Sequence, residues 1–135
     1  MKRLIIICLI ITGLTSCTDE DVYLKNTELI GKWKLIEHYL DPGDGSGTFM
    51  PVNSKKTIEF SKKGIVKSNG TLCTISSETG RVSLGIFNDK DGTITPKIGC
   101  NSSGYKINYK LVDGKLQLWY LCIEGCAQKF EKISN

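Results

Sequence analysis

The chain has 135 residues, among them 18 Lys and Arg against 14 Asp and Glu, with a formal net charge of +4. This length suits a single domain that is large enough to have its own hydrophobic core. Charges of both signs are interspersed and no concentrated basic stretch occurs, so we expect no nucleic-acid partner.

The first 16 residues have the pattern of a secretory signal peptide. Lys2 and Arg3 precede an uninterrupted apolar run, residues 4–11, and small residues lead to Cys17. The apolar stretch 4–14 has about half of the roughly 20 residues that a membrane-spanning helix needs. We therefore expect residues 1–16 to be cleaved, which leaves 16 basic residues against 14 acidic ones.

The run Leu14-Thr15-Ser16-Cys17 resembles the lipobox of bacterial lipoproteins. This resemblance implies that Cys17 carries a thioether-linked diacylglycerol and becomes the first residue after cleavage. It implies a protein of the cell envelope, anchored by lipid to the outer membrane. Residues 17–27 then form a polar tether, whose acidic residues 19–21 are either a solvated spacer or, by resemblance to some Gram-negative lipoproteins, a signal for export to the cell surface.

Alternating apolar and polar residues predict β-strands over most of residues 28–135. The clearest case is 105–111, and Asp113-Gly114 separates it from 116–120 with the residues of a type I′ hairpin turn. Other turn pairs are Lys63-Gly64, Asn69-Gly70, Asp91-Gly92 and Glu124-Gly125. Further strands are expected over 30–39, 65–68, 71–76, 82–87, 93–98 and 128–133.

Strands joined by short hairpins form a meander, and closure of its last strand on its first removes both exposed edges. We therefore expect an all-β fold, a small up-and-down antiparallel β-barrel of about eight strands over residues 28–135. Phe130 is expected to point inward. A short turn of helix around Glu28 and Leu29 is expected at the base of the barrel.

Four cysteines remain after the signal peptide and Cys17 are set aside: Cys73, Cys100, Cys122 and Cys126. An even number in an oxidising compartment predicts two disulfide bonds. Three connectivities are possible, and we favour Cys122 with Cys126 across a tight turn, which leaves Cys73 with Cys100. The alternative is a four-thiolate zinc site, but only one pair is close in sequence, so we expect no metal.

Gly31-Lys32-Trp33 is similar to the Gly-x-Trp element of lipocalins, in which the tryptophan plugs the closed end of the barrel. The long connection 40–54 lies where lipocalins carry a loop over the open mouth. More narrowly, the loop 41–47 and the segment 122–130 resemble those of bacterial lipocalin-like domain lipoproteins, which mostly have no established activity. The resemblance implies a lipocalin-like barrel with Gly31 and Trp33 as its plug.

The chain departs from ordinary lipocalins in two respects. It is shorter, and an eight-stranded barrel is just wide enough either to be filled by side chains or to hold one small ligand. The arginine that covers the tryptophan in lipocalins has no match, and Lys129 or Lys132 is the candidate substitute.

Two functions follow from these patterns. In the first, the barrel binds a small hydrophobic ligand under the 40–54 loop, in a lining of Phe49, Ile58, Phe60, Phe87, Tyr105, Tyr109, Leu118 and Tyr120. In the second, the barrel is filled and the protein is an interaction or scaffold lipoprotein, which contacts a protein partner through Trp119 or the 40–54 loop. Trp119 alternates with Leu118 and Tyr120, so we expect it on the outer face. We expect a monomer.

Catalysis has little support in the sequence. His38 is the only histidine, no Gly-x-Ser-x-Gly element occurs, and no paired carboxylates stand at a recognisable spacing. We therefore expect a protein that is not an enzyme and has no cofactor.

Overall fold

The computed structural model describes residues 26–97, 100 and 104–135. The predicted signal peptide, Cys17 and nearly all of the predicted tether lie outside the described residues. A 3-10 turn, η1 (Thr27–Leu29), stands where a short helix was expected. The strands are β1 (Gly31–Leu40), β2 (Thr48–Pro51), β3 (Thr57–Phe60), β4 (Ile65–Ser68), β5 (Ser83–Asn88), β6 (Thr93–Pro96), β7 (Ile107–Val112), β8 (Lys115–Trp119) and β9 (Cys126–Ser134).

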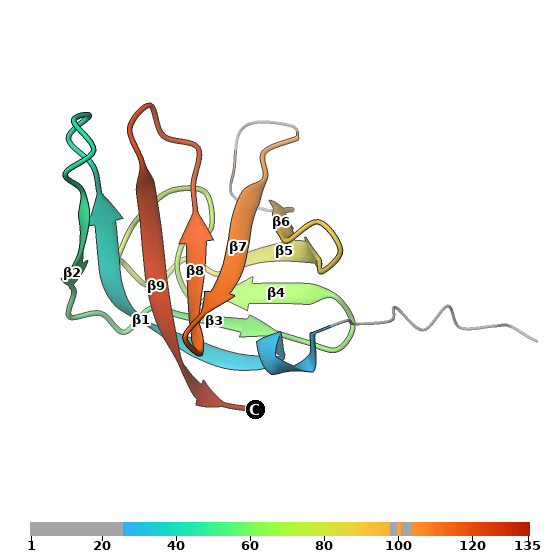
Figure 1. Ribbon diagram of the computed structural model, residues 1–135. Helices are drawn as coiled ribbons and strands as arrows, with labels where there is room; N and C mark the ends of the chain where they lie inside the picture. The colour runs from blue at the N-terminus through green and yellow to red at the C-terminus, as the bar shows by residue number, and fades with distance from the viewer. Residues whose placement is uncertain (1–25, 98–99, 101–103) are drawn as a thin grey trace, which may run out of the picture.

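All nine strands belong to one antiparallel sheet in the order β2-β1-β3-β4-β5-β6-β7-β8-β9, and β9 pairs with β1 (Figure 1). Strands β1 and β3 to β9 therefore form a closed eight-stranded barrel, which confirms the expected fold class. Strand β1 pairs with β3 over residues 31–34 and with the additional strand β2 over residues 37–40. A bulge between Leu35 and Glu37 in its pairing with β9 increases the local twist at this transition.

The two ends of the barrel differ. The base holds η1 and the β5–β6 and β7–β8 turns, and the backbone N–H of Asn26 donates to the Asp89 carboxylate at 2.7 Å. The opposite end, which we call the mouth, holds the loop 41–47, the connection 69–82 and the loop 120–125 (Figure 1). The chain thus enters the barrel at its base and carries its longest connections at the mouth.

Two predictions about the mouth were wrong. Residues 71–76 form no strand, and Asn69-Gly70 makes no hairpin, because the Asn69 side chain bonds back to β3 by accepting from the Thr57 N–H at 2.7 Å. The connection 69–82 instead folds over the mouth and buries Leu72 in the core. The segment 40–54, expected to be a loop throughout, contains β2 because residues 48–51 pair with the end of β1.

Both disulfide bonds of the favoured connectivity are present. Cys73 is bonded to Cys100 with their Cα atoms 5.2 Å apart, and Cys122 to Cys126 with their Cα atoms 6.0 Å apart. Cys73, Cys100 and Cys122 lie in connections between strands, and Cys126 is the first residue of β9. The pairing leaves none of these thiols available as a zinc ligand.

The base of the barrel is plugged by Trp33, which is buried and donates its indole N–H to the Leu29 carbonyl oxygen at 2.9 Å. The Lys132 ammonium lies 5.5 Å from the centre of the Trp33 ring and donates to the Glu28 carbonyl oxygen at 2.8 Å. Of the two candidate lysines, Lys129 and Lys132, it is therefore Lys132 that covers Trp33. Gly31 has a positive φ of 126°, and a side chain there would collide with the Ser134 carbonyl oxygen.

Phe130 tests the closure of the barrel, because it is fully buried and faces Leu35 of β1 and Leu116 of β8. We expect Phe130→Ala to lower the free energy of unfolding by about 3–5 kcal/mol through lost burial and a residual cavity. The control in the same strand is Ile133→Ala, since Ile133 is 48% exposed, with an expected change within about 0.5 kcal/mol. Urea unfolding measures both, and equal changes would contradict the inward position of Phe130.

Candidate functional site at the barrel mouth

The residues predicted to line a ligand cavity lie mostly within the core. Ile58 and Phe60 are 1% exposed and Leu118 is 0% exposed, while Phe87 and Tyr120 are buried. The ring of Phe60 contacts those of Phe87 and Tyr109, with centroids 5.2 and 6.0 Å apart. A side chain beside a cavity that admits water would retain accessible surface, so the interior at these residues is filled by neighbouring side chains.

The remaining predicted lining residues lie at the ends of the barrel or outside it. The Tyr109 hydroxyl is 3.2 Å from the Asp89 carboxylate at the base, and half-buried Tyr105 packs against the core. Phe49 is on the outer face, because it pairs with Tyr39 in the register of β1 and β2 and both contact Trp119. The expected interior position of Phe49 is therefore corrected.

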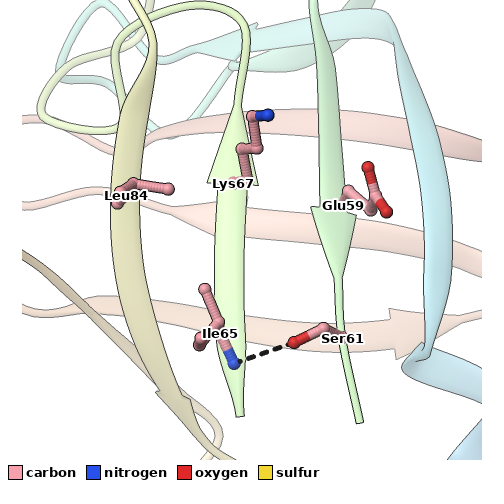
Figure 2. A pocket seen from close by; sticks show the side chains of 5 residues that line it. All are labelled: Glu59, Ser61, Ile65, Lys67 and Leu84. Carbon is pink, nitrogen blue, oxygen red and sulfur yellow. Dashed lines mark hydrogen bonds between the residues drawn. The ribbon is translucent and has the colours of Figure 1, made fainter. Parts of the chain in front are cut away.

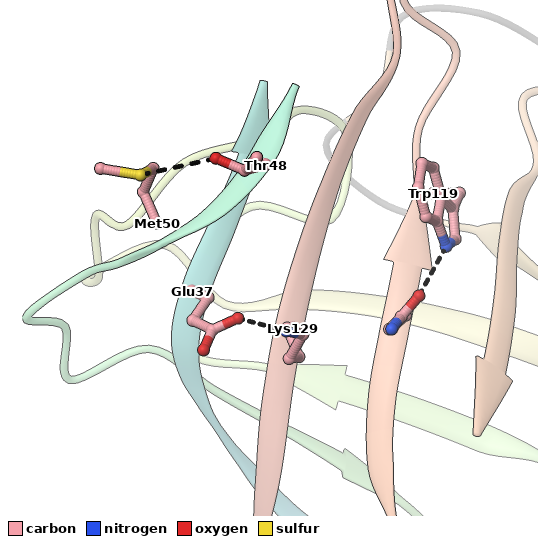
Figure 3. A network of polar contacts seen from close by, with 6 residues as sticks. Glu37, Thr48, Met50, Trp119 and Lys129 are labelled. Atoms are coloured by element: carbon pink, nitrogen blue, oxygen red, sulfur yellow. Dashed lines mark hydrogen bonds and ion pairs between the residues drawn. The ribbon is translucent and has the colours of Figure 1, made fainter. Parts of the chain in front are cut away.

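The outer face of β1, β2 and β8 carries three half-buried aromatic side chains, which we call the aromatic cluster: Tyr39, Phe49 and Trp119. Their ring centroids are 5.3 to 6.3 Å apart. The Lys129 ammonium lies 3.8 Å from the Phe49 ring centre and forms an ion pair with Glu37 (Figure 3). The outer position expected for Trp119 agrees with this arrangement, and its indole N–H donates to the Gln117 side chain at 3.2 Å.

Four large apolar side chains are exposed in β1, β2 and the loop 120–125, toward the mouth end, and we call them the rim patch: Leu40, Met50, Leu121 and Ile123. Ile123 is fully exposed at the tip of the loop that the Cys122–Cys126 bond closes. Large apolar side chains exposed toward one end of a small domain make that end a candidate interaction site.

The rim patch rests on two ordered loops. The Asp41 carboxylate accepts from the backbone N–H groups of Gly43, Gly45 and Gly47 at 2.8 to 3.2 Å. These bonds, that from Gly43 first, lower the pKa of Asp41. The Asp41 N–H donates to the Gly125 carbonyl oxygen at 2.9 Å, which joins the loops 41–47 and 120–125.

Just inside the mouth lies a group of polar side chains, which we call the mouth cluster: His38, Lys56, Tyr120 and Gln128. Tyr120 was a predicted lining residue, whereas the sequence analysis did not single out Lys56 and Gln128. Lys56 is 0% exposed, and its ammonium donates to the Gln128 side-chain oxygen and to the Ser76 carbonyl oxygen, both at 2.9 Å. The Tyr120 hydroxyl donates to the same Gln128 oxygen at 2.6 Å. The Gln128 amide nitrogen therefore faces the Ser76 carbonyl oxygen at 2.8 Å and His38 Nε2 at 2.9 Å.

The charges in this cluster are unusual. Burial lowers the pKa of Lys56 from 10.5 to about 8, and no carboxylate among the described residues pairs with its ammonium. Burial and the Lys56 charge lower the pKa of His38. His38 Nε2 must accept the bond from the Gln128 amide, so a neutral imidazole with its proton on Nδ1 fits this arrangement.

Two shallow hollows lie elsewhere on the described surface. One, of about 290 Å³, lies on the outer face of β3, β4 and β5 between Glu59, Lys67 and Leu84 (Figure 2). The other, of about 300 Å³, lies at the base beside Trp33 and Lys132. Among the described residues, no three His, Cys, Asp or Glu side chains come together as metal ligands.

Comparisons of the chain with protein-family models, with curated proteins and with solved structures found no match. Within residues 26–97, 100 and 104–135, no helix has the length and apolar character needed to cross a membrane.

Lys56 makes the stability of the fold depend on pH. Its pKa in the folded chain, about 8, is below the ordinary 10.5, so the unfolded chain binds the proton more tightly. Burial of the charged ammonium therefore lowers the free energy of unfolding in full only below about pH 8. We expect the free energy of unfolding to rise by roughly 2 kcal/mol between about pH 7.5 and about pH 9.5. The raised pKa of buried Tyr120 opposes this trend only at higher pH.

Urea unfolding at the two pH values measures this rise. The rise should vanish in Lys56→Met, which removes the buried charge and keeps the apolar stem. It should persist in Lys55→Met, because Lys55 is the exposed neighbour. An equal rise in both variants would show that other groups cause the pH dependence.

Proposed function

We propose that the chain is a lipid-anchored lipoprotein of the bacterial cell envelope that binds a protein partner through the mouth end of a filled β-barrel. It acts by binding and performs no chemistry. The observation that carries this proposal is the distribution of apolar surface. The interior at Ile58, Phe60 and Leu118 is packed, whereas the rim patch and the aromatic cluster present apolar surface outside.

The position of the proposed lipid anchor also favours a partner site at the mouth. Cys17, the proposed lipidation site, precedes Asn26 by nine residues, which span at most roughly 30 Å when extended. Asn26 is bonded at the base, at the opposite end from the loops 41–47 and 120–125 (Figure 1). A chain anchored in the outer membrane through Cys17 thus directs its base toward the lipid and its mouth away from it.

The chemistry of the mouth suits a protein surface. Trp and Tyr side chains are enriched at the centres of protein interfaces because they bury a large area and keep a polar group for hydrogen bonding. Trp119 and Tyr39 lie together on the aromatic cluster, and Ile123 projects from a loop that a disulfide bond constrains. Little conformational entropy is therefore lost when this loop is bound. Carriage of a small hydrophobic ligand in the deeper interior, among Ile58, Phe60 and Leu118, stays a prediction without a specific observation in its favour.

Lipidation is tested by replacing Cys17. We expect the unaltered chain to incorporate labelled palmitate in its host and to sediment with membranes. Cys17→Ser should lose the label, because serine has no thiol for the thioether. Incorporation of the label by Cys17→Ser at the level of the unaltered chain would contradict lipidation of this residue.

Partner binding is tested by placing a photo-crosslinking phenylalanine derivative at Ile123, at the mouth, and at Lys62, an exposed position in the β3–β4 turn at the base. We expect irradiation of host cells to give one discrete protein adduct from Ile123 and none from Lys62. The Ile123 adduct should weaken when Trp119→Ser is introduced. Adducts of equal yield from both positions, or none from Ile123, would contradict a partner site at the mouth.

A further inference from the structure

The segment that covers the mouth cluster is held mainly by hydrogen bonds. We call residues 74–80 the strap. Cys73, just before it, is fixed by its disulfide bond to Cys100, and β5 begins shortly after it. The strap itself belongs to no strand, and Thr74 and 78–80 are exposed.

The Ser76 carbonyl oxygen has an unusual environment for a neutral group. It accepts from the Lys56 ammonium at 2.9 Å and from the Gln128 amide at 2.8 Å. Beside it, the Ser54 hydroxyl donates to the Ser77 carbonyl oxygen at 2.7 Å. A buried cation is normally matched by an anion, because a dipole alone returns little of the lost hydration energy. Here the matching group is a main-chain carbonyl.

We propose that the mouth cluster is a binding site for a carboxylate with an apolar tail, and that the Ser76 carbonyl group occupies this site until such a ligand displaces the strap. One carboxylate oxygen takes the position of the Ser76 oxygen between Lys56 and Gln128. The other takes the third ammonium hydrogen of Lys56, for which the described residues supply no acceptor. This binding activity is independent of the proposed protein partner, since it uses none of the rim patch.

The other contacts of the mouth cluster hold its two donors, the Lys56 ammonium and the Gln128 amide nitrogen, in position. Tyr120 and Lys56 both donate to the Gln128 oxygen, which turns the Gln128 amide nitrogen toward the Ser76 oxygen. Gly70 lets the backbone pass close to the strap and to the aliphatic stem of Lys56, because an added Cβ would collide with the Glu78 carbonyl oxygen and lie 3.3 Å from the stem carbons. The donors are therefore already oriented before a ligand arrives, which lowers the entropy cost of binding.

The strap also indicates why the ligand needs an apolar tail. Ile75 packs against the core, so displacement of the strap exposes apolar surface around its former position. An alkyl tail covers this surface again, whereas acetate or inorganic phosphate does not. His38 is the half-buried member of the cluster, and its side chain lies between the Gln128 amide and solvent.

The experiment is a chemical-shift titration of residues 17–135 carrying Cys17→Ser, with decanoate as the probe and decanol as the uncharged control of equal tail length. Acetate serves as the control without a tail. We expect decanoate to shift the amide resonances of Ser76, Ser77 and Gln128 saturably. Decanol and acetate should each bind about tenfold or more weakly, because charge-assisted hydrogen bonds and tail burial are both needed.

Two variants complete the test. Lys56→Met should weaken decanoate binding about tenfold or more and leave decanol binding unchanged, while Lys55→Met should bind both as the parent chain does. A dispersed spectrum of Lys56→Met shows that the fold is kept. Equal affinity for decanoate and decanol, unchanged decanoate affinity in Lys56→Met, shifts confined to the aromatic cluster, or no saturable shifts at millimolar decanoate would each overturn the proposal.

Discussion

The pairing of β1 with β9 closes the sheet. It turns a meander with two free edges into a barrel, and it places Phe130 between Leu35 and Leu116. Once the sheet is closed, each strand has one face that must be packed with side chains and one that meets solvent. Because Ile58, Phe60 and Leu118 fill the inner face, the apolar groups that remain available for contact are those outside the barrel and at its mouth.

The mouth combines two physical solutions for closing an open barrel end. Disulfide bonds and the Asp41 carboxylate hold its loops in fixed positions. The strap covers the interior polar groups through single hydrogen bonds to Lys56, Gln128 and Ser54. The first arrangement suits a rigid contact surface, and the second suits a cover that a stronger acceptor displaces. The proposed partner surface therefore lies on rigid loops, whereas the proposed carboxylate site lies under a segment that can be displaced.

The sequence predicted the parts of the fold that depend on local periodicity and turn chemistry. The strand at 65–68, the hairpin at Asp113-Gly114 and both disulfide bonds were predicted, as was the outer position of Trp119. The segment 71–76 was wrongly predicted to be a strand, because the long-range bond from Asn69 to β3 overrides its local preference. Phe49 was misplaced because the pairing of β2 with β1, which sets its face, is not visible in a loop-like sequence.

Two members of the mouth cluster, Lys56 and Gln128, were not predicted from the sequence for a different reason. Lys56 follows another lysine and looks like part of a solvated segment, yet it stands two residues before Ile58 and four before Phe60. That alternation places the Lys56 side chain on the inner face. Gln128 likewise stands two residues before the buried Phe130 and lies on the inner face. Polar residues in register with a core face are thus the signal that could have identified the cluster. What no pattern supplied was the identity of the acceptor, since Ser76 reaches Lys56 only through the fold of the connection 69–82.

Between the Trp33 plug and the mouth cluster, the folded barrel is filled by its own side chains. Xenon binds in dry apolar cavities, so a xenon titration followed by methyl NMR measures whether the barrel holds such a cavity. We predict that the methyl resonances of Ile58, Leu116 and Leu118 show no saturable shifts. Saturable xenon-induced shifts at these three residues would reveal an interior cavity and show that the barrel is not filled.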